Sequence, residues 1–435
     1  MNNEPQLMAE PKQGVPDVIN TARAFEAMCE RFAQSSGPVA ADAERASGFR
    51  YTHSDYLVQF KREDAGIALV DPQAVAADGC DWAEFMQAVG DAEFILHDAR
   101  QDLPGFADLG IRPASLFDTE MAARLLGLTR FGLASVTERY LGFTLAKEHS
   151  AADWSYRPLP RDWRNYAALD VELLIELREA MLTDLKAAGK LEWAREEFQY
   201  TLDQGLAPRK EKSQPWLHIS HITAIQRDHQ ALAVAKALWQ KRDALASSYD
   251  IAPTLLLSDR AIIEAAQKKP HNNREFRAIR SLNERVRIHM GNEQDKMFER
   301  YAPIQRMVKP SVWKNTIQEA LQLKPSQWPD MGRIAKQDDR SRVEGGQAHA
   351  PKQMKIWKTH HPDRFARLQR ARSVIHQIGV DTRTPDEIVM KPQIIRDLCW
   401  TDEPGQVGVS EFLRSEGARD WQIALCAASL SRVIM

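Results

Sequence analysis

Two carboxylates stand two positions apart in the short apolar segment VAADAE, as Asp42 and Glu44. In a β-strand, residues i and i+2 point to the same face, so both carboxylates would project together from the end of an apolar strand. Burying two like charges side by side is costly unless a cation neutralises them, and a hard divalent ion takes such oxygen ligands. The alternative is an acidic pair past a strand end that faces water, which is the commoner meaning of an isolated Asp-x-Glu pattern.

Two further segments carry acidic residues in settings that could do chemistry. Asp102 falls in the opening turn after the strand-like segment EFILHD, where His97 and Asp98 form a neighbouring pair that is more often structural than ligating. Tyr166 and Asp170 stand four residues apart in RDWRNYAALDVELLIEL, which places them on one face of a helix. The apolar neighbours of Asp170 predict a partly buried carboxylate that needs partners. Alone, this segment is also compatible with an ordinary amphipathic helix.

A second Asp-x-Glu pattern, Asp118 and Glu120, leads directly into the helical segment MAARLLGL. Asp118 is therefore predicted to cap the amino end of that helix, and Glu120 to lie in its first turn. We assign this pattern a structural role.

Strands and helices that alternate along the front half must position these residues. Residues 1–16 are expected to form a flexible tail and residues 17–204 one α/β domain with a mixed sheet, because a hairpin is followed by alternating strands and helices. The predicted strands cover residues 38–44, 56–60, 66–72 and 93–98. The predicted helices cover residues 17–35, 81–89, 118–127 and 133–142, with one long or two short helices over 161–189.

The sequence of the back half predicts helical modules. A segment that mixes Pro, Gly, Ser and charge predicts a linker at 205–217, and a second polar segment near 336–352 predicts another linker or loop. Helical patterns cover residues 221–250, 257–270, 366–379 and 392–400. These patterns predict helical domains at 218–302 and 303–435.

Taken together, the motifs resemble the DEDD superfamily of 3′–5′ exonucleases. That superfamily has D-x-E on a first strand, an Asp about 60 residues later, and a late helix with Y-x-x-x-D in its Tyr-containing subgroup. Here these motifs are Asp42 with Glu44, Asp102, and Tyr166 with Asp170. The resemblance implies an RNase H-like mixed sheet flanked by helices.

Other segments resemble the ribonuclease D family more closely. They are ILHDARQDL (95–103), DWSYRPLP (153–160) and ALWQKRDALASSYDIAPTLLLSDRAIIEAAQKKP (237–270), the last of which resembles an HRDC module. A more divergent HRDC-like copy follows at 364–400. The family often has Thr between the first two carboxylates, where this chain has Ala43, and that position should point away from them.

The resemblance implies that Asp42, Glu44, Asp102 and Asp170 hold two divalent ions, Mg²⁺ or Mn²⁺. Two such ions, about 3.5–4 Å apart, would activate water, stabilise the leaving oxygen and neutralise the phosphate. Tyr166 would orient the attacking water, because a phenol with a pKa near 10 is a poor base at neutral pH.

The implied activity is a 3′–5′ exoribonuclease that releases 5′-mononucleotides from RNA with a free 3′ end, such as tRNA precursors or small structured RNAs. Two alternatives stay open from the sequence: the same fold acting on DNA, and a catalytically silent RNA-binding scaffold. All five motif residues are present, which argues against the silent scaffold.

Charge is divided unevenly along a chain of 435 residues and net charge −2. Residues 1–200 hold 20 Lys and Arg against 33 Asp and Glu, whereas the rest holds 38 against 27. An acidic catalytic half and a basic helical half fit a nucleic-acid partner. The candidate phosphate contacts are Lys236, Lys241, Arg242, Lys268, Lys269 and Arg157, and the candidate stacking residues are Phe49, Tyr51 and Tyr56.

Four scattered cysteines without a CxxC motif exclude a disulfide framework and a zinc site, and fit a reducing compartment. No signal peptide and no membrane-spanning segment are expected. We therefore expect a cytoplasmic protein without a membrane partner. A monomer is expected because three modules could enclose a single RNA end.

Overall fold

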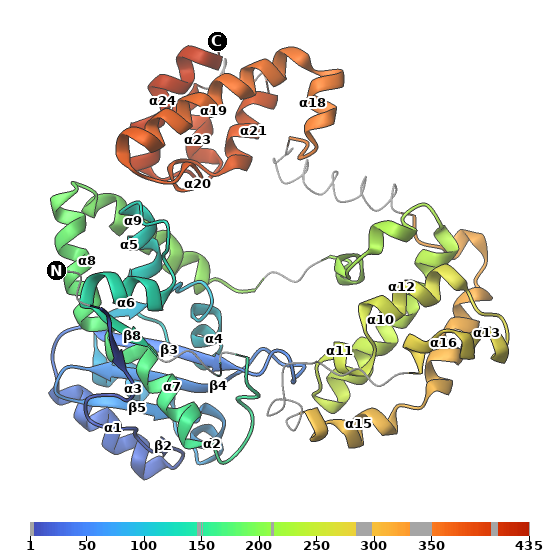
Figure 1. The fold of residues 1–435 in the computed structure, drawn as a ribbon, viewed down its shortest axis with the longest axis horizontal. Helices are drawn as coiled ribbons and strands as arrows, with labels where there is room; N and C mark the ends of the chain where they lie inside the picture. The colour runs from blue at the N-terminus through green and yellow to red at the C-terminus, as the bar shows by residue number, and fades with distance from the viewer. Residues whose placement is uncertain are drawn as a thin grey trace.

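The computed structural model describes residues 4–145, 149, 151–209, 213–283, 298–330, 350–401 and 408–434. A mixed α/β domain is followed by two all-helical domains (Figure 1). Each domain has a hydrophobic core of its own. The predicted fold class is confirmed. The polar segment predicted near 336–352 lies mostly outside the described residues.

The sheet of the first domain has six strands in the order β2-β5-β4-β3-β6-β7. Strand β4 runs antiparallel to both neighbours, whereas the other pairs are parallel, so the sheet is mixed as expected. The strands are β2 (Val18–Ile19), β3 (Val39–Arg45), β4 (Asp55–Arg62), β5 (Gly66–Val70), β6 (Glu93–Leu96) and β7 (Ser115–Asp118). The four predicted strands correspond to β3 to β6, while β2 and β7 were not predicted.

Helices cover both faces of this sheet. The helices are α1 (Ala22–Gln34), α2 (Pro72–Ala77), α3 (Trp82–Val89), α4 (Leu103–Leu109), α5 (Thr119–Leu125), α6 (Leu133–Leu141), α7 (Arg161–Glu172), α8 (Leu174–Ala187) and α9 (Leu191–Gly205). The segment left open as one helix or two forms two helices, α7 and α8, that meet at Leu173.

Alternation along β4 shows how the two faces are used. Phe60 points to one face, where its ring lies 4.4 Å from that of Phe85 in α3. Leu57 points to the other face and packs in one cluster with Trp163 and Ala167 of α7. The period of two in the strand therefore separates the face that packs into the main hydrophobic core from the face that α7 covers.

The amino-terminal segment is more ordered than the flexible tail predicted for residues 1–16. Strand β1 (Gln6–Met8) pairs in parallel with β8 (Phe143–Leu145) in a separate two-stranded sheet. Glu10 accepts hydrogen bonds from Arg161, and Lys12 pairs with Glu176 at 2.8 Å. The described part of this segment is therefore fixed to the domain by backbone pairing and ion pairs, neither of which its polar composition reveals.

The two helical domains share a pattern of three helices. The first domain contains α10 (His229–Tyr249), α11 (Pro253–Leu256), α12 (Asp259–Lys268), α13 (Asn273–Ala278), α15 (Ala302–Met307) and α16 (Pro310–Leu321). The second contains α18 (Met354–His360), α19 (Pro362–Thr382), α20 (Asp386–Val389), α21 (Pro392–Trp400), α23 (Val409–Ser415) and α24 (Asp420–Ile434).

Three successive helices of the second domain, α19 to α21, repeat α10 to α12 at an offset of 133 residues. The two long helices have 21 residues each, and both end at a left-handed residue, Asp250 and Arg383. A four-residue helix and a third helix then begin at equivalent positions in both domains. This correspondence supports the prediction that the second domain is an HRDC-like copy.

The last domain is joined to the α/β domain through Trp421. Its ring stacks on Trp193 of α9 at 4.7 Å, and its Nε1 donates to Glu197 at 2.9 Å. We expect Trp421→Ala to lower the free energy of unfolding by about 3 kcal/mol or more, since it removes a buried indole and a buried donor. Urea denaturation measures this loss. A loss no larger than that of the half-exposed Tyr156→Ala control would contradict it.

Among the described helices, none combines the length and the apolar composition that crossing a membrane requires. The four cysteines are free thiols.

Candidate active site

Strand β3 directs its two carboxylates toward α7. Asp42 lies opposite Gln59 and Glu44 opposite Leu57 in the β3–β4 register, so both share the face that α7 covers. Ala43 points the other way into the main core, as expected. The alternation predicted from the sequence therefore sets the direction of both side chains.

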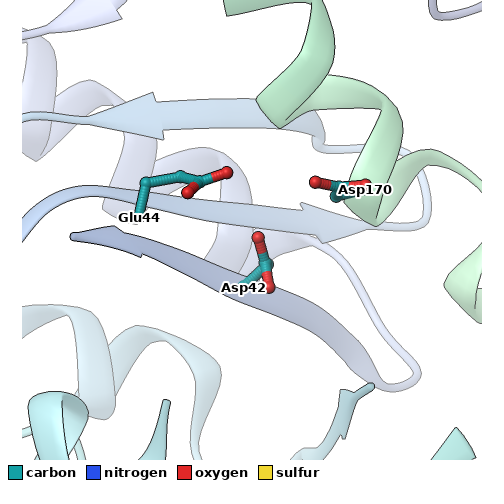
Figure 2. Close-up of side chains that lie close together, drawn as sticks. All are labelled: Asp42, Glu44 and Asp170. Atoms are coloured by element: carbon teal, nitrogen blue, oxygen red, sulfur yellow. The ribbon is translucent and has the colours of Figure 1, made fainter. Parts of the chain in front are cut away.

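Three carboxylates meet at this face. One oxygen each from Asp42, Glu44 and Asp170 lie within 4.8 Å of one another (Figure 2). Glu44 is buried, and the other two are half-buried. This oxygen-only donor set suits a hard divalent cation such as Mg²⁺ or Mn²⁺.

Asp102 enters the same pocket from another direction. It precedes α4 but makes no capping hydrogen bond with its side chain. Its Oδ1 instead accepts from Nη2 of Arg45 at 3.0 Å. Asp102 therefore lies beside the three clustered carboxylates but is not one of them.

The pocket has a volume of about 390 Å³ and is open to solvent. Its walls include residues from the catalytic motifs, the loop after β3 and the first helical domain. The lining residues are Asp42, Ala43, Glu44, Arg45, Ser47, Gly48, Phe49, His97, Gln101, Asp102, Ala151, Ala152, Tyr166, Asp170 and Phe298. All five predicted site residues thus line one pocket.

The electrostatics of the pocket are those of crowded acids. Burial and repulsion from neighbouring carboxylates raise the pKa of Asp42, Glu44 and Asp102 well above the usual range. Burial also raises the pKa of Asp170 to about 7, although Tyr166 partly offsets this by hydrogen bonding. Because four acids cannot all ionise cheaply here, the site favours either bound protons or bound cations.

Tyr166 lies one helical turn before Asp170 and within hydrogen-bonding reach of it. Burial and the nearby Asp170 raise the pKa of the Tyr166 hydroxyl above its ordinary value. The phenol is therefore neutral at physiological pH and acts as a hydrogen-bond donor, not as a base.

The structural role assigned to the second Asp-x-Glu pattern is confirmed. Asp118 accepts from the backbone N–H groups of Glu120 and Met121 at the start of α5. Glu120 pairs with Arg124 at 2.9 Å. His97 contacts Thr119 at 2.8 Å, so its partner is not the adjacent Asp98.

Two of the basic candidates are structural. Arg242 is buried and pairs with Asp259 at 2.7 Å, and Arg157 pairs with Asp71 and donates to backbone carbonyls. Their partners occupy the guanidinium groups, which contradicts a role for either as a phosphate contact. These ion pairs, which the fold makes, are not visible in a charge pattern.

The other basic candidates lie at the domain surface. Lys268 pairs with Glu264, and Lys269 pairs with Asp228. Lys236 lies 5.9 Å from the ring of Trp216. Lys241 is exposed and stays a predicted phosphate contact.

The aromatic candidates, two in the loop after β3 and Tyr56 in β4, pack against the first helical domain instead of projecting freely. Phe49 stacks on Phe298 at 4.6 Å, and the Tyr51 hydroxyl donates to Asp243 at 3.2 Å. The hydroxyl of Tyr56 lies 3.3 Å from that of Thr52. Of the three, Phe49 lines the pocket.

Several pocket residues were not predicted from the sequence, and Phe298 and Arg45 are two of them. Phe298 is 254 residues from Glu44 in the chain, and no local pattern connects them. Arg45 follows Glu44 directly, where strand alternation would place it on the opposite face. A shift in the β3–β4 register between Glu44 and Arg45 changes that direction.

Three families match the chain, one in each domain. Residues 16–186 match a family described as 3′-5′ exonuclease, and residues 231–293 match the HRDC domain. Residues 350–434 match a family described as 3′ to 5′ exonuclease C-terminal domain.

Among known proteins, ribonuclease D of Shewanella sp. is 32% identical over 230 residues, which are 51% of this chain and 57% of the relative. The chain belongs to the ribonuclease D family. A crystallised protein from Bifidobacterium adolescentis is 63% identical over 99% of this chain and all of its own, with a TM-score of 0.92. Escherichia coli RNase D, an exoribonuclease involved in structured RNA processing, shares the fold at 19% identity and a TM-score of 0.59, over 96% of this chain and 98% of its own.

Membership of the ribonuclease D family agrees with the site. The exonuclease match contains all five motif residues, and the HRDC match covers α10 from residue 231 and all of α11 to α13. The chain spans little more than half the length of the Shewanella ribonuclease D.

Proposed function

We propose that this chain is a metal-dependent 3′–5′ exoribonuclease that removes 5′-mononucleotides one at a time from RNA. Small structured RNAs with a free 3′ end, such as tRNA precursors, are the proposed substrates. The observation that carries the proposal is the meeting of three carboxylates, with Asp102 and Tyr166, in one open pocket. Relatives named ribonuclease D favour RNA over DNA.

The residues divide into holding and orienting groups. Asp42, Glu44 and Asp170 would hold one divalent ion, and Asp102 together with Asp42 a second. When bound, the ions would supply a nucleophilic water at neutral pH and neutralise charge on the phosphate. Tyr166 would donate a hydrogen bond that orients the attacking water toward the phosphorus.

Cleavage of matched strands tests this function. The full chain is incubated with 5′-labelled RNA, DNA of the same sequence, or circular RNA, with Mg²⁺, Mn²⁺ or EDTA. We expect linear RNA to shorten one nucleotide at a time with either ion, and circular RNA to stay intact. Faster cleavage of DNA would favour a deoxyribonuclease, and no cleavage of any strand would favour a binding scaffold.

Tyr166→Phe tests the orienting role. We expect kcat on RNA to fall about 100-fold, because the hydroxyl is removed while the ring stays packed beside Trp154 and His149. The affinity for Mn²⁺ should stay unchanged, as measured by calorimetry without RNA. Tyr140→Phe is the matched control, because its hydroxyl pairs with Asp184 away from the pocket. Unchanged kcat in Tyr166→Phe would contradict the role.

We also propose that the protein acts as a cytoplasmic monomer. All five predicted site residues come from one chain, so the pocket does not need a second copy. Light scattering during size-exclusion chromatography measures the oligomeric state.

A further inference from the structure

An arginine at the wall of the pocket joins two buried acids. Arg45 donates from Nη1 to Asp55 at 3.3 Å and from Nη2 to Asp102 at 3.0 Å. The side chains of Asp55 and Asp102 are 0% and 5% exposed, while that of Arg45 is 21% exposed. One guanidinium therefore connects the ends of β3 and β4 with the start of α4.

The backbone of β3 places Arg45 in this position. Glu44 lies opposite Leu57, whereas Arg45 lies opposite Asp55, so the register skips Tyr56. Such a bulge changes the direction of a side chain and is common beside active sites. Arg45 consequently faces the pocket together with Glu44.

Close packing against α4, as well as the hydrogen bond from Arg45, fixes the side chain of Asp55. A Cβ on Gly105 of α4 would lie 2.2 Å from Oδ2 of Asp55, so only glycine allows this approach. That same oxygen is buried and finds no hydrogen-bond partner among the described residues. Since Asp55 has little room to move, it holds Arg45 from the side away from the pocket.

We propose that Arg45, anchored by Asp55, is a positioning residue that orients Asp102 and limits how strongly the site attracts divalent cations. This inference rests on the proposed function, because it concerns the same metal-dependent site. The charge of Asp55 balances that of Arg45, which leaves four carboxylates to balance two divalent ions. Arg45 can hold both acids at once, because an arginine presents two donors in a fixed fork.

Removing either member of the Arg45–Asp55 pair should shift cation affinity, and in opposite directions. Arg45→Met removes a positive charge beside the carboxylates, so cations should bind more tightly. Asp55→Asn releases Nη1 of Arg45 and removes a negative charge, so Arg45 should pair more fully with Asp102 and cations should bind more weakly. A purely structural role would weaken binding in both variants.

Calorimetric titration of the metal-free full chain with Mn²⁺, without RNA, measures these shifts. We expect Arg45→Met to bind Mn²⁺ about tenfold more tightly and Asp55→Asn about tenfold more weakly, with the double variant near wild type. Arg45→Lys keeps the charge but loses the fork, so its Mn²⁺ affinity should stay near wild type while kcat on RNA falls about tenfold. Arg100→Met, at an exposed arginine outside the pocket, is the matched control.

Each outcome of these titrations supports or overturns the positioning role of Arg45. Shifts in the same direction, or none in either variant, would overturn the inference, and thermal melting identifies a variant that has not folded. If Arg45→Met does not fold, the double variant and Arg45→Lys still test the charge and the fork separately. If the variants show the expected shifts in Mn²⁺ affinity but wild type cleaves no RNA, the proposed function is refuted and the positioning role of Arg45 still holds.

Discussion

Asp42→Asn is expected to reduce kcat on RNA by about a thousandfold or more at saturating Mg²⁺. Asp42 shares a face of β3 with Glu44 and lies within 4.8 Å of both other clustered carboxylates. An amide in its place removes a charge and one of the oxygens that would contact both ions. Release of 5′-mononucleotides from labelled RNA measures the loss.

The fold should survive this substitution, because Asn has nearly the same shape and the neutral side chain removes repulsion among buried acids. We expect the metal-free variant to melt at the same temperature as wild type or slightly higher. Asp98→Asn is the matched control, since Asp98 lies four residues from Asp102 but does not line the pocket. Equal activity in Asp42→Asn and wild type would refute the assignment of the site.

The part of this site that sequence could predict is the part set by short-range periodicity. A period of two aligned Asp42 with Glu44, and a helical turn aligned Tyr166 with Asp170. The capping role of Asp118 also follows from local chemistry, because its carboxylate accepts from backbone groups two and three residues ahead. Each of these relations involves residues close together in the chain.

The parts that sequence could not predict depend on long-range packing or on a local irregularity. The bulge after Glu44 directs Arg45 into the pocket, and Phe298 reaches it from another domain. The sequence made Arg242 a candidate phosphate contact, but it is buried against Asp259. A residue type and its spacing do not reveal which partner a fold brings beside it.

The two helical domains are a second case in which residue types do not reveal a structural relation. Helices α19 to α21 repeat α10 to α12 at a constant offset, although the residues at matching positions differ widely. Both repeats place a left-handed residue after the long helix, and in each domain that residue contacts the α/β domain. Asp250 pairs with Arg50 at 3.2 Å, and the carbonyl of Arg383 accepts from Lys190 at 3.3 Å. The repeated turn thus serves as a docking point in both domains.

Apparent affinity for Mg²⁺ and Mn²⁺ is expected to rise steeply with pH, because protons and cations compete for the same carboxylates. The pKa of Asp170 is about 7, and those of Asp42, Glu44 and Asp102 are also raised. Below pH 7 each bound proton that an ion displaces should weaken binding about tenfold per pH unit. Mn²⁺ titrations at pH 6, 7 and 8 measure the slope, and an affinity independent of pH would contradict it.

The proton on Asp170 also couples pH to the stability of the metal-free protein. Asp170 has a pKa of about 7 when folded and about 3.9 when unfolded, so between these values only the folded state holds the proton. Stability from this group is therefore complete below about pH 4 and is lost as pH rises toward 7, by about 1.4 kcal/mol per pH unit. In EDTA, urea denaturation should show wild type losing stability from pH 5 to pH 7, and Asp170→Asn losing less. Saturating Mn²⁺ should abolish this loss in wild type, because the ion replaces the proton and neither the loaded folded state nor the unfolded state then holds a proton on Asp170. A metal-free wild type whose stability does not fall over this range would show that Asp170 is already ionised at pH 5, and the pocket would then need another source of positive charge.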